Sequence, residues 1–194
     1  EKNYEALQHL GKAYNATFVI VQDTLSALQL LAKHHLEEIS GCIRIGITGS
    51  NGKTTTKECL GAILSRSADT AMNEGNYNSE IGLPLAALRV KQGQRFAVFE
   101  MGMNRKGEMD ILADIVRPDH AVITNIGSAH IGLLGSLQTI AEEKKKIFSY
   151  FDGEQTGFLY EGEPFFTFLT DGVNGTFIPY GPVSTNGYEG SESQ

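Results

Sequence analysis

Residues 42–60 read C-I-R-I-G-I-T-G-S-N-G-K-T-T-T-K-E-C-L, and this stretch decides the fold class of the chain. A β-branched run is followed by a glycine-rich turn, and a segment of helical composition then begins at Lys53 and Thr54. Strand, loop and helix in this order indicate a phosphate-binding loop. The spelling departs from the common pattern G-x-x-x-x-G-K-[ST], because Ile47 occupies the position of the first glycine. The alternative, an ordinary glycine-rich turn before a helix, explains the G-K-T-T core less well.

The residue types in this loop suit a nucleoside triphosphate. Glycines let backbone N–H groups approach phosphate oxygens, and the N-terminus of the following helix adds partial positive charge. The Lys53 ammonium is expected to reach the terminal phosphates, and the Thr54 hydroxyl to ligate Mg²⁺. The sequence therefore predicts ATP as the ligand. The predicted ATP-binding residues are Gly49, Ser50, Asn51, Gly52, Lys53, Thr54 and Thr55.

Composition and charge limit the class of protein. The 194 residues are enough for one domain with a hydrophobic core, and 41% hydrophobic and 20% charged residues are typical of globular proteins. A net charge of −7 argues against a nucleic-acid partner. No apolar run is long enough to cross a bilayer, so we expect no membrane insertion. The N-terminus shows no signal-peptide pattern, and Cys42 and Cys59 fit reduced core residues, so we predict a cytoplasmic location. We also expect a monomer.

The order of apolar runs after Ile43 predicts an α/β fold, a mostly parallel sheet with flanking helices of the P-loop nucleotide-binding type. Strand-like and helix-like runs alternate at 43–47, 53–66, 80–90, 95–101, 107–116, 119–124, 137–151 and 156–160. Before them we expect a short helix at 4–14, a strand at 17–21 and a helix that begins after Asp23. We interpret residues 1–40 as the end of an N-terminal domain or a connector, and residues 41–194 as an incomplete central ATP-binding domain.

Polar residues that directly follow apolar runs are the next candidates, because ligands of open α/β sheets bind at the carboxyl ends of the strands. Glu100 ends the run Phe96–Phe99, and a carboxylate there could hold the Mg²⁺ that bridges nucleotide phosphates. Its alternative role is that of a helix cap or a solvent-paired acid. Asn125 and His130 follow the next run and are candidates for the same site.

Lys144 stands out by its position in a helical pattern. Apolar residues recur at helical spacing around it, and Lys144 lies on this apolar stripe, whereas Lys145 and Lys146 fall outside the stripe and are predicted to be solvated. Lys144 could extend its ammonium outward to water, or it could reach the nucleotide site as a phosphate ligand or a modified side chain.

Four ordered motifs resemble the Mur ligases, ATP-dependent amide-forming enzymes of peptidoglycan precursor synthesis, and within them the MurF type, which adds D-alanyl-D-alanine. The motifs are G-I-T-G-S-N-G-K-T-T-T-K-E at 46–58, G-N-Y-N-S-E-I-G-L-P at 75–84, E-M-G-M-N at 100–104 and R-P-D-H-A-V-I-T-N-I-G-S-A-H at 117–130. Ser79 and Tyr160 stand where the family usually has Asn, and Tyr160 would be at the adenine contact. By itself, the amide-rich second motif would indicate only a loop.

The resemblance implies roles for individual residues. Lys53, Glu100, His130 and Lys144 would be catalytic. Thr54, Glu100 and His130 would be metal ligands, together with Lys144 as a carbamate, and the cofactors would be ATP and two Mg²⁺ ions. Asn76, Asn78 and Asn125 would bind substrate. A carbamate would also explain an inward-facing lysine, because it converts a cation into an anionic oxygen donor suited to a hard metal ion.

The resemblance also implies a reaction. ATP would phosphorylate the terminal carboxylate of a UDP-N-acetylmuramoyl tripeptide, and the amine of D-alanyl-D-alanine would attack the acyl phosphate. The expected partners are thus small-molecule substrates. Alternatives are another Mur-type ligase, an enzyme similar to folylpolyglutamate synthetase, or a nucleotide-binding module without ligase turnover. A P-loop kinase or GTPase is disfavoured, because no guanine-reading N-K-x-D motif is present. We also expect the family's C-terminal domain to be absent from this chain.

Overall fold

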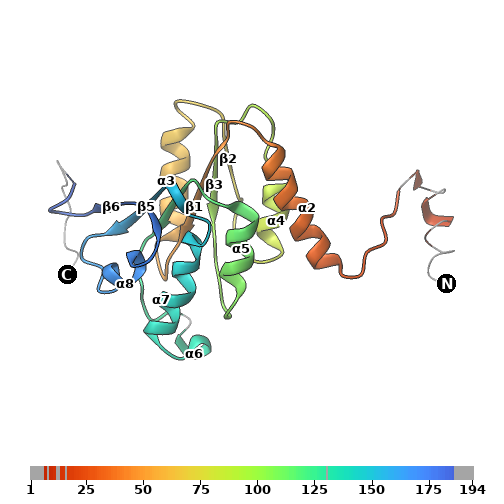
Figure 1. Ribbon diagram of the computed structural model, residues 1–194. Coiled ribbons are helices and arrows are strands. Elements are labelled where there is room, and N and C mark those ends of the chain that lie inside the picture. The colour runs from red at the N-terminus through yellow and green to blue at the C-terminus, as the bar shows by residue number, and fades with distance from the viewer. Residues whose placement is uncertain (1–6, 8, 12–13, 16, 130, 186–194) are drawn as a thin grey trace.

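The computed structural model describes residues 7, 9–11, 14–15, 17–129 and 131–185. Its strands form one six-stranded parallel sheet in the order β2-β3-β1-β4-β5-β6 (Figure 1). The strands are β1 (Ile43–Thr48), β2 (Thr70–Met72), β3 (Phe96–Glu100), β4 (His120–Ile123), β5 (Asp152–Tyr160) and β6 (Asn174–Tyr180). The helices are α2 (Thr24–Glu38), α3 (Lys53–Leu64), α4 (Gly82–Ala87), α5 (Glu108–Val116), α6 (Ile131–Leu134), α7 (Leu137–Lys145), the 3₁₀ turn η1 (Lys146–Phe148) and α8 (Phe166–Thr170). The predicted α/β fold is confirmed.

The central strand β1 brings the site together. It pairs with β3 on one side and with β4 on the other, and the register places Ile47 opposite Glu100 and Thr48 opposite Ile123. Because all three strands are parallel, their carboxyl ends meet at one edge of the sheet. The glycine-rich loop after β1, the carboxylate at the end of β3 and the residues after β4 therefore converge there.

The two faces of the sheet are covered differently (Figure 1). One face packs against α2, α4, α5, α7, η1 and α8 in the larger hydrophobic core, which includes Phe99, Met109 and Leu112. The other face carries Ile45, Ile47, Val98 and Val122, and α3 is the one described helix that packs on it. A cavity of about 390 Å³ lies between α3 and strands β1, β4, β5 and β6 on this second face.

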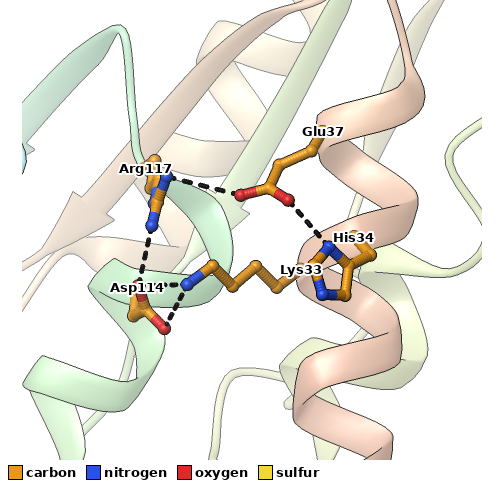
Figure 2. Close-up of polar contacts among 5 residues, drawn as sticks. All are labelled: Lys33, His34, Glu37, Asp114 and Arg117. Carbon is orange, nitrogen blue, oxygen red and sulfur yellow. Dashed lines mark hydrogen bonds and ion pairs between the residues drawn. The ribbon is translucent and has the colours of Figure 1, made fainter.

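Helix α2 is attached to the sheet domain by apolar and polar contacts. Asp23 caps its N-terminus by accepting a hydrogen bond from the Ser26 N–H (2.6 Å), as the sequence predicts. Ala32 and Leu36 are buried in the larger core. Figure 2 shows the polar contacts to α5 and to Arg117 just after it: Lys33 pairs with Asp114 (2.8 Å), and Arg117 lies 3.3 Å from Asp114 and 3.3 Å from Glu37, which also contacts His34.

The differences from the predicted elements have local causes. The predicted strand at 17–21 is wrong: these residues have no regular structure and Val19 is 81% exposed, because a β-branched run forms a strand only beside a partner. Strand β2 has only three residues and was not predicted. Strand β6 was not predicted either; it contains Pro179, which an edge strand tolerates. The predicted helix at 4–14 lies largely outside the described residues. Among the described residues, no helix is both long and apolar enough to cross a bilayer.

Candidate functional site

The loop after β1 is shaped by two glycines. A Cβ at Gly49 would lie 1.8 Å from the Thr124 hydroxyl, so only glycine allows the loop to approach β4 this closely. Gly52 has φ 78° and precedes the first residue of α3, a left-handed conformation that glycine adopts without strain. Helix α3 therefore begins directly at the end of the loop. The first backbone N–H groups of a helix have no partner within the helix and can bind an anion. This agrees with the predicted phosphate-binding loop.

Asn125 holds this loop against the end of β4. Its side-chain oxygen accepts hydrogen bonds from the N–H groups of Ser50 (3.1 Å) and Asn51 (3.0 Å). The Ser50 hydroxyl donates to the Gly127 carbonyl and accepts from the Gly127 N–H. Thr124 donates its hydroxyl proton to the Asn51 carbonyl (2.6 Å). Asn125 thus has a structural role in the loop, and its role in substrate binding stays a prediction.

Lys53 folds back over the loop. Its ammonium donates to the Gly49 carbonyl at 2.9 Å. Burial lowers the pKa of Lys53, and the negative charge of Glu100 opposes this shift. The lysine is therefore held at the loop by a single carbonyl, and a bound phosphate would give it a stronger, charge-assisted partner.

Glu100 is the centre of the polar site. Its side chain is almost fully buried, at 2% exposure. One carboxylate oxygen accepts the Thr54 hydroxyl proton (2.7 Å), and the other accepts a hydrogen bond from the Asn78 amide (2.7 Å). The structure thus brings together three predicted site residues from α3, β3 and the loop before α4.

Carboxylate and hydroxyl oxygens are ligands that suit Mg²⁺. Among the described residues, no three His, Cys, Asp or Glu side chains gather as a metal cluster. Mg²⁺ is commonly bound by only one or two protein oxygens together with substrate phosphates and water. The pair formed by Thr54 and Glu100 fits that mode, so these two residues could hold a magnesium ion that comes with a nucleotide.

Lys144 points inward, as its place on the apolar stripe predicts. It is buried, at 2% exposure, on α7. Burial and, to a smaller extent, the positive charge of Lys53 together lower the pKa of Lys144 to about 7. The ammonium of Lys53 therefore disfavours a second positive charge at Lys144. A lysine with this pKa is partly neutral at neutral pH, and a neutral amine is a nucleophile.

Lys145 and Lys146, which were predicted to be solvated, are less buried than Lys144 but make specific contacts. Lys145 donates to the carbonyls of Phe168 and Asp171, at 2.8 and 2.7 Å. Lys146 pairs with Asp110 and Glu143, at 2.7 and 2.8 Å. Both are half-buried because α8 and α5 pack beside the polar side of α7, which the helical pattern of α7 alone does not reveal.

The amide-rich loop lies against the end of β3. The Gly102 N–H donates to the Asn78 carbonyl at 2.9 Å, and a Cβ at Gly102 would lie 3.0 Å from the Asn78 side chain. Asn76 is exposed on this loop. His130 lies outside the described residues. Tyr160 ends β5 and is 38% exposed, and its ring lies 6.1 Å from that of Tyr180.

Sequence reasoning missed two buried residues of this site, Lys57 and Asn73. Lys57 is fully buried, at 0% exposure, and donates to the Asn73 carbonyl at 2.6 Å. Asn73 is 1% exposed and hydrogen-bonds both backbone groups of Glu100. The spacing of Lys53 and Lys57 is the signal that could have found the first, because residues four apart lie on one face of a helix.

Comparison with known proteins gives consistent matches. Residues 47–189 match the protein family described as the Mur ligase middle domain. A relative from Treponema pallidum, named UDP-N-acetylmuramoyl-tripeptide--D-alanyl-D-alanine ligase, is 46% identical over 170 residues, which make up 88% of this chain and 36% of the relative.

Two solved structures extend these matches. MurF from Acinetobacter baumannii has a TM-score of 0.81 at 35% identity, over 84% of this chain and 36% of that chain. MurF from Thermotoga maritima in complex with ADP has a TM-score of 0.75 at 32% identity, over 82% of this chain and 37% of that chain. The chain thus spans about a third of the length of these relatives.

Proposed function

We propose that this chain, which belongs to the Mur ligase family, is the ATP-binding part of a ligase that joins D-alanyl-D-alanine to a UDP-N-acetylmuramoyl tripeptide. The observation that carries the proposal is the buried Glu100 carboxylate, bonded to Thr54 of the phosphate-binding loop and to Asn78 of the amide-rich loop. This carboxylate joins the proposed nucleotide site to the proposed substrate site. The Thermotoga relative was solved with ADP, which supports nucleotide binding by the same fold.

The proposal includes the organisation of a longer protein. Residues 1–40 would be the end of an N-terminal domain or a connector, and residues 41–194 part of the central ATP-binding domain. A further domain would close over ATP and bring residues for the incoming amine. Closure of this kind positions substrates and excludes water, so we expect the isolated chain to bind nucleotide without efficient ligation.

The chemistry is a phosphoryl transfer followed by an amide-forming attack. An oxygen of the substrate carboxylate attacks the γ-phosphorus of ATP, the bond to the β-phosphate oxygen breaks, and ADP leaves. The amine of the second substrate then attacks the acyl carbon of the acyl phosphate and expels phosphate. No protein nucleophile takes part. The role of Lys53 is to offset negative charge on the phosphates, which would otherwise repel the carboxylate.

Two Mg²⁺ ions would assist by neutralising charge shared between the phosphates and the carboxylate. Thr54 and Glu100 are our proposed ligands for one ion, and His130 with carbamylated Lys144 for the other. The carbamate forms when the neutral Lys144 amine adds to CO₂: an N–C bond forms and one proton leaves. The pKa of about 7 supports this step, because it leaves a neutral amine at neutral pH. The carbamate anion would also attract the Lys53 ammonium, whereas a protonated Lys144 would repel it.

Two measurements test the proposal. Calorimetric titration of the chain with ATP and Mg²⁺ should show magnesium-dependent binding, and no binding would contradict the nucleotide site. In a protein that carries all the domains of these relatives, phosphate release from ATP should require both the tripeptide substrate and D-alanyl-D-alanine. Release that instead depends on a folate substrate and glutamate would assign the chain to a folylpolyglutamate synthetase. The 46% identity to the Treponema ligase favours the first outcome.

A further inference from the structure

Lys57 is a buried cation next to the proposed site, and nothing in the proposed chemistry uses it. It lies on α3, three residues after Thr54 and four after Lys53. Its ammonium contacts the Asn73 carbonyl at 2.6 Å and the carboxylate of Glu58 at 3.1 Å, and Glu58 is itself 59% exposed. Burial of a cation is costly, and replacing a whole buried ion pair by apolar residues is often neutral or stabilising, so a buried ammonium is weak evidence for a stabilising role. Stability alone therefore does not explain this lysine.

The Asn73 carbonyl that Lys57 binds belongs to a weakly paired segment. Asn73 directly follows β2, a three-residue strand at the edge of the sheet. The last bond of the strand ladder, from the Asn73 N–H to the Val98 carbonyl, is long at 3.4 Å. The much shorter contact with Lys57 fixes the segment at the point where the ladder ends.

Asn73 in turn fixes the backbone of Glu100. Its side-chain oxygen accepts from the Glu100 N–H at 2.8 Å, and its amide donates to the Glu100 carbonyl at 3.0 Å. The same amide donates to the Tyr77 carbonyl at 2.8 Å, in the loop that carries Asn78. One buried side chain therefore holds both the strand end that carries the carboxylate and the loop that binds it.

These contacts form a closed ring of hydrogen bonds. Lys57 binds the Asn73 carbonyl, and the Asn73 side chain binds the backbone of Glu100. The Glu100 carboxylate in turn binds Thr54, which lies one turn before Lys57 on the same helix. We propose that Lys57 and Asn73 are positioning residues that set the Glu100 carboxylate for a magnesium–nucleotide complex. This inference rests on the proposed function, because it assumes that Glu100 contacts the metal. Groups that orient metal ligands from behind typically change metal affinity when they are removed.

The test measures binding of ATP to the 194-residue chain as a function of Mg²⁺, by calorimetry, and binding of ATP in EDTA. Lys57→Met keeps the length of the side chain and removes the ammonium. We expect the Mg²⁺ concentration for half-maximal ATP binding to rise about tenfold, while the affinity for ATP in EDTA changes less than twofold. Asn73→Ala, which removes the amide contacts directly, should raise the Mg²⁺ requirement at least as much.

Glu58→Gln is the matched control, because it removes the negative charge beside Lys57 and leaves the contact with the Asn73 carbonyl intact. It should bind Mg²⁺ and ATP like the wild type. If Lys57→Met weakens ATP binding equally with Mg²⁺ and in EDTA, the role of Lys57 is structural and the inference is wrong. If the wild type binds ATP with Mg²⁺ but both variants match it, the inference also fails and the proposed function stands. If the wild type does not bind at all, the proposed function itself fails.

Discussion

Lys57 on α3 and Lys144 on α7 are both buried lysines beside one site, yet their surroundings differ. Lys57 has a carbonyl at 2.6 Å and a carboxylate at 3.1 Å as partners. Lys144 instead has a pKa lowered to about 7, mainly by burial and further by the positive charge of Lys53. A buried ammonium with acceptors can act as a fixed cation, whereas one beside another cation tends to lose its proton and becomes chemically available. This difference is consistent with the roles we propose, in which Lys57 orients Glu100 and Lys144 reacts with CO₂.

The largest effect is expected at Lys144. Lys144→Ala in the protein with all its domains should lower ligase turnover more than about a hundredfold, because the proposed carbamate ligand and its metal contact would both be lost. Extra bicarbonate should not restore activity, since no amine remains, but a short carboxylic acid that fills the space should restore part of it. The rate of phosphate release from ATP measures both the loss of turnover and its partial restoration. Full activity in this variant would contradict the chemical role of Lys144.

The next largest effect is expected for Glu100→Gln, which tests whether Lys57 acts through the Glu100 carboxylate. The substitution keeps the size of the side chain and one acceptor oxygen but removes the charge. The Mg²⁺ requirement for ATP binding should rise about thirtyfold, more than in Lys57→Met, because a direct ligand outweighs a group that only orients it. Titration calorimetry at fixed ATP measures the difference. An equal or smaller effect than that of Lys57→Met would remove Glu100 from the metal site.

The stability of the chain should depend on pH through Lys144. Folding holds its pKa at about 7, whereas an unfolded lysine titrates near ~10.4. Between these values the unfolded chain binds a proton that the folded chain does not, so the free energy of unfolding rises with pH. From pH 7 to 9 in CO₂-free buffer the gain should be about 2 kcal/mol.

Urea denaturation at the two pH values measures this gain. Lys144→Met lacks the titrating amine and serves as the reference, because all other groups stay the same. The wild type should gain more stability than the variant over this range. Parallel pH dependence in the two proteins would show that Lys144 keeps its proton in the folded state.

The smallest effect is expected for Lys146, which neighbours Lys144 in sequence but not in environment. Its ammonium is partly exposed and pairs with Asp110 and Glu143. Lys146→Ala should lower the free energy of unfolding by about 1 kcal/mol, as partly exposed ion pairs contribute little. Ligase turnover should stay within about threefold of the wild type, as for other substitutions outside a site. A loss comparable to that of Lys144→Ala would mean that the helical stripe identifies the wrong lysine.

Local patterns in the sequence are sufficient for much of the fold. The strand, glycine-rich loop and helix at 42–60 predicted the central elements, since glycine conformation and β-branched composition act within a few residues. The apolar stripe of α7 predicted that Lys144 faces inward, because helical periodicity alone sets which side is buried. The apolar run Phe96–Phe99 predicted that Glu100 lies at the carboxyl end of a strand.

Contacts between distant segments were decided only by the tertiary structure. Asn73 and Lys57 are 16 positions apart, and only the pairing of β2 with β3 and the packing of α3 bring them to Glu100. The same holds for Lys145, whose carbonyl partners lie in and just after α8, and for the contact of Lys146 with Asp110 on α5. The sequence by itself determined the phosphate-binding loop and the inward lysine, because both follow from local backbone geometry and periodicity. The tertiary structure decided that Lys57 lies beside a carbonyl and a carboxylate whereas Lys144 is buried under the influence of another cation, because these surroundings come from groups elsewhere in the chain.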